Sequence, residues 1–404
     1  LYLIEISNWY INYLQFEIWK GYRILVSMDN NNFIPVFKPS LSMKNKYDVF
    51  RSILKSEISG TSPVVKEFED DLSTTFDRKY VVTVSNGSVA LELAIKSLDL
   101  KENDEVIIPS FTIVSCLSAV VRSGATPVFC DVDPFTWCMN LDEIKSKVTK
   151  NTKAILVVHT YGLPAEVSEI EKYCLNNKIT LIEDAAEAHG ITVDERPCGS
   201  FGKISTMSFY ANKHITAGEG GAVLTNNEDI FNELIQMRNL DFRQDRRFRH
   251  DNLYWNYRMG GLQAALGKSQ IKDLEKTIKF KIEQGNYYQD LLSDSSDLIQ
   301  LPLKNNGEHL NHYWVFGILL KKENIKNKVV NELNDLNIQT RPFFWPLHKQ
   351  DALPEKFKNS SLKLIVSEKL GNDGFYIPMG DHVTKDMQKF ISKSILDIVN
   401  RLSD

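Results

Sequence analysis

The sequence is poor in cysteine, and its few cysteines are widely spaced. There are five in 404 residues, and no two of them form a C-x-x-C pair. A disulfide framework or a zinc knuckle needs closely spaced cysteines, so the spacing argues against both. An odd, scattered set in a large chain is typical of free thiols in a reducing cytoplasm. A metal site built from His159, His189 and the cysteines is a weak alternative, because no ligand pair has helix or knuckle spacing. We therefore predict no metal.

The chain also lacks an excess of charge of one sign. Its 48 Lys and Arg residues against 52 Asp and Glu residues give a formal net charge of −4. Without a basic field the protein is not expected to bind nucleic acid. An apolar fraction of 43% and a charged fraction of 25% match an ordinary globular protein. The length predicts two or three domains, or one large α/β body with an appendage.

Long apolar runs are absent as well. The first 28 residues are rich in Trp, Tyr, Ile and Leu, but charged residues such as Glu5 and Glu17 interrupt them. No run is long enough to span a bilayer, and a signal peptide would need a basic start and a cleavage site. Regular patterning begins only at Phe33, so we predict an N-terminal extension over residues 1–32. Residues 1–27 are interpreted as an extension or as upstream sequence translated in frame; the alternative is an amphipathic helix on the body or on a membrane surface.

From Tyr80 onward, short apolar segments alternate with helical ones. The predicted strands share a nearly continuous apolar sequence and cover residues 80–84, 106–108, 127–130, 154–158 and 179–182. This alternation predicts an α/β fold with a mainly parallel sheet covered by helices on both faces. Residues 260–280 are predicted to be helical. We predict a large domain over residues 33–280 and a smaller C-terminal α+β domain over residues 281–404.

Ligands of parallel sheets bind at the carboxyl ends of the strands, which directs attention to four segments. These segments are residues 85–88, 109–112, 159–161 and 184–189. In the first, Ser85-Asn86-Gly87-Ser88 lies between a predicted strand and helix, where free N–H groups can bind an anion. The alternative is a plain helix cap. Neither a P-loop nor a G-x-G-x-x-G motif accompanies it.

Two further motifs contain titratable side chains. In residues 183–190, Asp184 and Glu187 follow an apolar strand, and a carboxylate there can hold a protonated ring nitrogen. The alternative is a group of acids at a helix start. In the second motif, Lys213 precedes the glycine-rich turn 218–221. A desolvated lysine suits Schiff-base formation, and the alternative is an ordinary surface lysine.

An anion site, an acid and a buried lysine together meet the needs of pyridoxal phosphate. In these motifs and in their order, residues 33–402 resemble the DegT/DnrJ/EryC1/StrS sugar aminotransferases. The resemblance implies the PLP-dependent transferase fold type I (aspartate aminotransferase-like), with pyridoxal 5′-phosphate as the cofactor. It also implies a homodimer with shared active sites and a catalytic pair: Lys213, which bonds covalently to the cofactor, and Asp184 beside its ring nitrogen. Glu187 corresponds to the group near the 3-oxygen of the ring.

The same resemblance assigns the phosphate end of the cofactor. Gly87, Ser88 and Ser208 correspond to phosphate ligands, and Asn256 to an asparagine that the neighbouring subunit donates. The sequence departs from the family where many members place an aromatic residue over the ring. Here Ile113 stands in that position, so dispersion contacts remain but aromatic stacking is lost.

A subgroup is indicated by several of these motifs together with the segment 340–348. They look most like GDP-perosamine synthases, which use L-glutamate to aminate C4 of a nucleotide-linked 4-keto-6-deoxyhexose in polysaccharide biosynthesis. The resemblance implies substrate-binding roles for Arg247, Arg249, Arg341 and His348, although the arginine-rich stretch could also be a solvated loop. Alternatives are a dTDP- or UDP-linked acceptor, a dehydratase, or a non-catalytic sugar-sensing protein. Related dehydratases have histidine in the position of Lys213.

Overall fold

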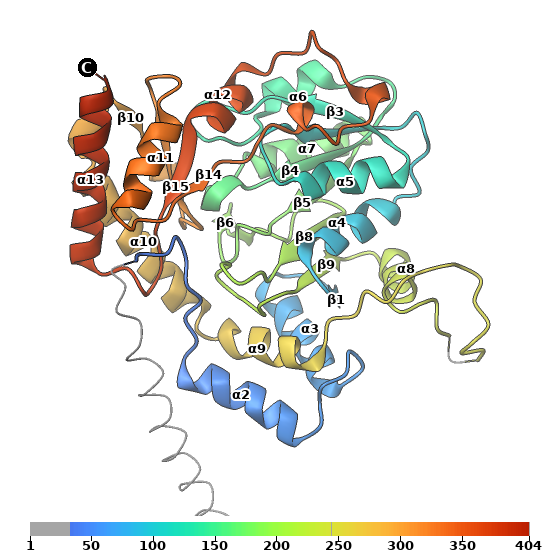
Figure 1. The fold of residues 1–404 in the computed structure, drawn as a ribbon. Helices are drawn as coiled ribbons and strands as arrows, with labels where there is room; N and C mark the ends of the chain where they lie inside the picture. Colours follow the sequence, from blue (N-terminus) through green and yellow to red (C-terminus); the bar gives the residue numbers. More distant parts are fainter. Residues whose placement is uncertain (1–32, 244, 404) are drawn as a thin grey trace, which may run out of the picture. The chain divides into compact units, whose positions relative to one another are not determined.

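The structure is a computed structural model that describes residues 33–243 and 245–403. The predicted N-terminal extension, residues 1–32, lies outside the described residues. The compact body runs from Pro35 to the last described residue, Ser403. It contains a large sheet and a smaller sheet, both covered by helices (Figure 1). In the described part of the chain, no helix is both long and apolar enough to cross a membrane.

The large sheet has seven strands in the order β1-β9-β8-β5-β4-β2-β3. They are β1 (Tyr80–Val84), β9 (Gly221–Thr225), β8 (Ile204–Ser208), β5 (Thr180–Asp184), β4 (Thr152–Val158), β2 (Glu105–Pro109) and β3 (Thr126–Cys130). The strands from β8 to β3 are parallel, whereas β9 runs antiparallel to both of its neighbours. The prediction of a mainly parallel sheet is therefore confirmed.

Two layers of helices cover the large sheet. One face packs against α3 (Pro63–Thr75), α6 (Leu141–Lys147), α7 (Val167–Asn177) and α9 (Gly261–Ile271), and the other against α4 (Gly87–Lys96), α5 (Val114–Ser123) and α8 (Glu228–Arg238). Strand β4 shows why its sequence is apolar throughout. Ile155 and Val157 enter the first core, and Leu156 enters the second, because successive side chains point to opposite faces. Helix α2 (Met43–Leu54) lies against α9, where Asn45 donates to the Ser269 hydroxyl at 2.8 Å.

The smaller sheet is antiparallel and has the order β10-β13-β15-β14. Its strands are β10 (Ile299–Gln300), β13 (Phe316–Leu320), β15 (Gly374–Ile377) and β14 (Arg341–Pro342), and its helices are α10 (Leu274–Leu291), α11 (Lys326–Asp335), α12 (Ile365–Asp373) and α13 (Lys385–Ser403). Two two-stranded sheets complete the body, β6 (Thr192–Val193) with β7 (Arg196–Pro197) and β11 (Asn305–Asn306) with β12 (His309–Leu310).

Residues 260–280 are helical, as predicted, but they belong to two helices. The chain breaks between α9 and α10 at Lys272 and Asp273. The break is needed because α9 packs on the large sheet, whereas α10 runs in another direction and approaches Gly190 and Tyr313 (Figure 1). The predicted domain boundary at residue 280 falls inside α10, and the two domain limits remain a prediction.

Hydrogen bonds join segments next to the smaller sheet to the carboxyl edge of the large one. The Leu347 N–H donates to the Ser110 carbonyl at 2.7 Å, and the His312 N–H donates to the Gly162 carbonyl at 2.8 Å. Both acceptors follow strands of the large sheet, β2 and β4. The C-terminal part of the body therefore contacts the large sheet just beyond the ends of β2 and β4.

Candidate active site

Several predicted site residues lie at one edge of the large sheet. Asp184 is the last residue of β5, Ser208 is the last residue of β8, and α4 begins just after β1. Asn86 caps α4 by accepting a hydrogen bond from the Val89 N–H at 3.0 Å. Because β5 and β8 are parallel neighbours and β9 connects β8 to β1, these ends meet at the same edge.

Lys213 lies in the connection between β8 and β9 and points inward. Its side chain is 7% exposed, and its Nζ is 3.6 Å from Glu187 Oε1. On another side, Nζ lies 3.4 Å from the ring centroid of Trp314. Burial lowers the pKa of the Lys213 amine, and the carboxylates of Glu187 and Asp184 partly oppose this effect. A buried amine that gives up its proton more readily than usual can act as a nucleophile and as a base.

The two carboxyl groups have different surroundings. Asp184 is buried, and its Oδ1 accepts hydrogen bonds from the Ala186 N–H at 3.1 Å and the Thr206 hydroxyl at 3.3 Å. Burial raises the pKa of Asp184, while these hydrogen bonds and Lys213 favour its charged form. For Glu187, burial raises the pKa to about 7, against the attraction of Lys213. The Tyr161 N–H donates to Glu187 Oε2 at 2.8 Å.

The start of α4 lies against the end of β8. A Cβ atom on Gly87 would come within 2.8 Å of the Ser208 Cβ, so this contact requires a glycine. Ser88 is exposed, and its hydroxyl lies 2.6 Å from that of Ser115. The first N–H groups of a helix have no acceptor within the helix, so those of Gly87 and Ser88 are suited to hold an anion.

Ile113 lies at the mouth of this region and is 42% exposed, just before α5 begins. Its role over the cofactor ring remains a prediction.

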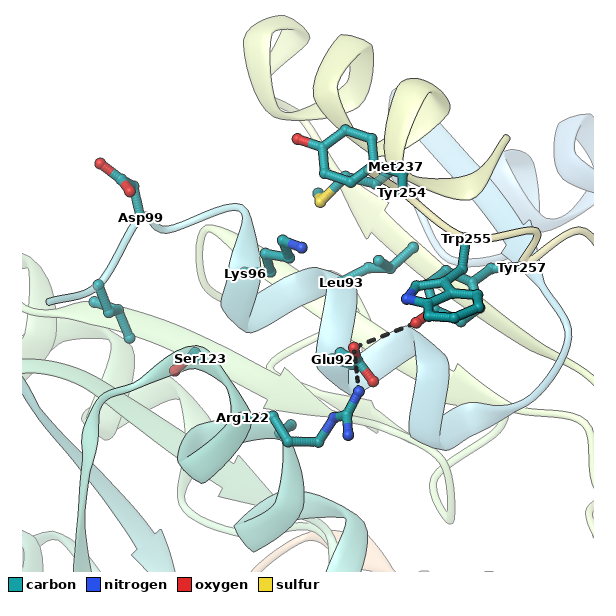
Figure 2. A pocket seen from close by; sticks show the side chains of 12 residues that line it. Glu92, Leu93, Lys96, Asp99, Arg122, Ser123, Met237, Tyr254, Trp255 and Tyr257 are labelled. Atoms are coloured by element: carbon teal, nitrogen blue, oxygen red, sulfur yellow. Dashed lines mark hydrogen bonds and ion pairs between the residues drawn. The ribbon is translucent and has the colours of Figure 1, made fainter. Parts of the chain in front are cut away.

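Asn256 is exposed on a segment that is held against α4. The Tyr257 carbonyl accepts from the Ser85 N–H at 2.9 Å, and the Tyr257 hydroxyl donates to Glu92 at 3.4 Å. Figure 2 shows this contact at a pocket of about 330 Å³, in which Arg122 reaches the same carboxylate. Trp255, next to Asn256, is 69% exposed. The contacts of Tyr257 thus fix the segment, and the Asn256 side-chain oxygen accepts from the Arg258 N–H at 3.2 Å.

The arginine-rich stretch divides into paired and unpaired side chains. Arg243 and Arg246 both form ion pairs with Asp251, at 3.1 and 2.6 Å. Arg247 instead lies over the rings of Phe242 and Phe248, and no described residue forms an ion pair with Arg249. The two arginines predicted to bind substrate are therefore those without a carboxylate partner among the described residues.

The two predicted substrate residues near the smaller sheet differ in accessibility. The Arg341 guanidinium lies 4.7 Å from the ring centroid of Phe37 and is half-buried. His348 is buried, with Nδ1 2.6 Å from the Ser110 hydroxyl and Nε2 3.1 Å from Glu368. Both ring nitrogens of His348 therefore already have partners within the chain, and its substrate-binding role remains a prediction.

A separate buried group consists of His159, Glu183 and Cys198, whose potential ligand atoms lie within 4.8 Å of one another. His159 Nδ1 accepts from the Ala165 N–H at 3.1 Å, so its proton is on Nε2, which lies 2.9 Å from Glu183. Glu183 also accepts two backbone N–H groups from residues 199–201. Hydrogen bonds use both imidazole nitrogens, so the geometry is that of a structural link.

Trp314 was missed by the sequence analysis. It contacts Lys213 from the smaller part of the body, and its indole N–H donates to the Asn212 carbonyl at 3.1 Å. Tyr161 had been indicated by its position after a strand, but its contact with Glu187 had not. A single tryptophan in the predicted C-terminal domain gives no signal of either contact.

Comparisons with known proteins agree with the geometry. The model of the DegT/DnrJ/EryC1/StrS aminotransferase family matches residues 42–396. The chain is 34% identical over 363 residues to a GDP-perosamine synthase of Escherichia coli O157:H7, covering 90% of this chain and 98% of that protein. It is 32% identical over 321 residues to a dTDP-4-dehydro-2,3,6-trideoxy-D-glucose 4-aminotransferase of Saccharopolyspora spinosa, covering 75% and 82%.

A solved structure has the same fold. It is an E. coli GDP-4-keto-6-deoxy-D-mannose-3-dehydratase with bound hydrated PLP, and it superposes with a TM-score of 0.82 at 24% identity, covering 90% of this chain and 99% of that one. The predicted fold type is therefore confirmed. The residues present also fit pyridoxal phosphate: a helix start with a required glycine for the phosphate, Asp184 for the ring nitrogen and Lys213 for the covalent bond.

Proposed function

Because the chain belongs to the DegT/DnrJ/EryC1/StrS family of pyridoxal phosphate-dependent sugar aminotransferases, we propose that it moves the amino group of L-glutamate to C4 of a nucleotide-linked 4-keto-6-deoxyhexose. The favoured acceptor is GDP-4-keto-6-deoxymannose, which would yield GDP-perosamine. The similarity to a GDP-perosamine synthase along 98% of that enzyme's length supports this acceptor. The observation that carries the aminotransferase chemistry is the buried Lys213–Glu187 pair beside Asp184.

Each of the three titratable side chains has a separate role in the proposed reaction. When bound, pyridoxal phosphate supplies a ring that takes up the electrons of the bond broken at the substrate carbon. The Asp184 carboxylate would hold the proton on the ring nitrogen and so maintain that capacity. The Lys213 amine, whose pKa burial lowers, would carry the proton between the carbon atoms that exchange it. Glu187 would face the 3-oxygen of the ring.

The predicted substrate-binding arginines suit an anionic substrate. Arg247 and Arg249 have no carboxylate partner among the described residues, so they could bind a diphosphate without first breaking an ion pair. Arg341 would supply a further positive charge from the smaller sheet. His348 would act only after exchanging a partner, Ser110 or Glu368, for substrate.

The assembly that we propose is a homodimer with shared active sites. Asn256 is exposed on an anchored segment, and a second copy would receive its side chain at the phosphate end of the cofactor. In this arrangement each site combines Lys213 of one chain with Asn256 of the other.

A panel assay tests the acceptor. Glutamate-dependent turnover is measured with GDP-4-keto-6-deoxymannose and with the dTDP- and UDP-linked 4-keto-6-deoxyglucose. We expect the highest kcat/KM with the GDP-linked sugar. A higher value with either other sugar supports the viosamine-type alternative, which the similarity to a dTDP-sugar 4-aminotransferase favours. Loss of the sugar 3-hydroxyl would identify a dehydratase, and binding without turnover a sugar-sensing protein.

A further inference from the structure

Trp314 contacts the segment around Lys213 at two points. The Lys213 Nζ lies over the indole ring, 3.4 Å from its centroid. One residue earlier in the lysine segment, the Asn212 carbonyl accepts from the indole N–H at 3.1 Å. The Lys213 side chain and Trp314 are each 7% exposed, so little water competes with their contact.

The backbone fixes the position of the indole. The Trp314 N–H donates to the Tyr161 carbonyl at 3.1 Å, and the Tyr161 N–H in turn donates to Glu187 at 2.8 Å. Gly162 is needed here, because a Cβ atom on it would come within 2.5 Å of the Trp314 nitrogen. The indole and the Glu187 carboxylate are therefore held in one hydrogen-bonded unit on two sides of the lysine amine.

The two neighbours of the amine act differently on its proton. A carboxylate attracts the ammonium ion and can also take its proton. The face of an indole attracts the ammonium through the ring quadrupole but has no lone pair that could accept the proton. The indole face therefore favours the protonated amine without competing for its proton, whereas Glu187 can both attract the ammonium and accept that proton.

We propose that Trp314 is a positioning residue for Lys213. The Trp314 ring holds the ammonium group of Lys213, and the Trp314 N–H holds the backbone next to the lysine, at Asn212. Trp314 acts when the amine is not bonded to the cofactor. The inference rests on the proposed function of Lys213, and it adds to that function a residue that lies just before β13 of the smaller sheet.

The test measures the protonation of Lys213 in the full-length chain freed of cofactor. Acetic anhydride labels amines only when they are unprotonated, so the extent of Lys213 acetylation across a pH series, read by mass spectrometry, gives its pKa. The variants are Trp314→Leu, which removes the ring face, and Trp314→Phe, which keeps a weaker face and removes the N–H. The matched control is Trp137→Phe, because Trp137 is a buried tryptophan that also packs on Tyr161, and its contacts do not include Lys213.

We expect Trp314→Leu to lower the Lys213 pKa by about one unit, since a desolvated ammonium–indole contact has roughly that strength. Trp314→Phe should lower it by less, and Trp137→Phe should leave it unchanged. In the cofactor-loaded enzyme, Trp314→Phe should reduce kcat about tenfold with little change in KM, because the lost N–H holds the backbone at Asn212, next to Lys213, rather than the substrate.

The proposal is overturned if folded Trp314→Leu protein shows an unchanged or raised Lys213 pKa, or if Trp137→Phe lowers it equally. A raised Lys213 pKa would mean that water entering the space of the lost ring stabilises the ammonium ion more than the ring did. If Trp314→Leu does not fold, Trp314→Phe decides by the same criterion. Borohydride trapping of the cofactor on another lysine would refute the proposed function of Lys213, and the labelling experiment is independent of that outcome.

Discussion

The tight contact between Gly87 and Ser208 makes Gly87→Ala an informative change. The new methyl carbon would lie 2.8 Å from the Ser208 Cβ and 3.1 Å from its Oγ. Nonbonded carbons prefer separations of about 3.5–4.0 Å, so the start of α4 and the end of β8 must move apart by roughly an ångström. Both elements contribute proposed phosphate ligands, and the change should widen the space between them.

The size of the effect follows from the strain. Adding one carbon to a closely packed site typically destabilises it by about 1–3 kcal/mol. If this strain is relieved by displacing the phosphate ligands, it should weaken cofactor binding roughly 5- to 150-fold, because 1.4 kcal/mol corresponds to a factor of ten. Pyridoxamine 5′-phosphate is the suitable ligand, since it cannot form a covalent bond with Lys213. Its Kd is measured by titration calorimetry.

Gly124→Ala provides the control. Gly124 ends α5 with a φ of +90°, and a Cβ atom on it would meet nothing within 4 Å. Its substitution should lower the melting temperature through backbone strain of about 1 kcal/mol and leave the Kd unchanged. If Gly87→Ala binds pyridoxamine 5′-phosphate as tightly as the unaltered chain does, the assignment of this contact to the phosphate site is wrong.

Three other predictions address the site and its surroundings. Lys213→Ala should fold but lose turnover, and borohydride should fix the cofactor to Lys213 in the unaltered chain; covalent cofactor on a different lysine would contradict the assignment. Asn256→Ala should weaken phosphate binding by about 1.5–3 kcal/mol, and mixing it with Lys213→Ala chains should restore activity, because one site of each heterodimer is then intact; no recovery after verified subunit exchange would exclude shared sites. Burial lowers the pKa of Lys281 from 10.5 to about 7, so the unfolded chain binds more protons between these values and stability rises with pH across that range. Lys281→Met should therefore raise the melting temperature most below pH 7 and least near pH 10, and an equal gain at both would show that Lys281 is not desolvated.

Much of the candidate site could be predicted because it depends on strand ends. Asp184 and Asn86 follow strands whose apolar sequence is evident, and the ends of neighbouring parallel strands meet at one edge. The glycines after Lys213 indicated a crowded connection. These signals are local sequence patterns, so they can be recognised without knowledge of the tertiary structure.

The remaining features depend on contacts between distant parts of the chain. Trp314 reaches Lys213 only because the 312–314 segment bonds to the turn after β4, which no local pattern encodes. Strand β9 is a short apolar run after glycines, and its antiparallel insertion between β1 and β8 was not predicted. The ion pairs that distinguish Arg243 from Arg249 likewise depend on how one loop folds back on itself.

The insertion of β9 between β8 and β1 also has a consequence for the order of folding. The β8–β9 pairing closes a short loop. The β1–β9 pairing joins Tyr80 to Thr225, so closing this longer loop costs more conformational entropy. The close approach of Gly221 to Asn86 depends on the β1–β9 pairing, in which Gly221 lies opposite Val84. On the ribosome, where the chain emerges from its N-terminus, the start of α4 is completed when residue 225 has appeared, well before Trp314 is made. A nascent chain is therefore expected to form the proposed anion-binding start of α4 first, and Lys213 gains its aromatic neighbour only when the segment before β13 is synthesised.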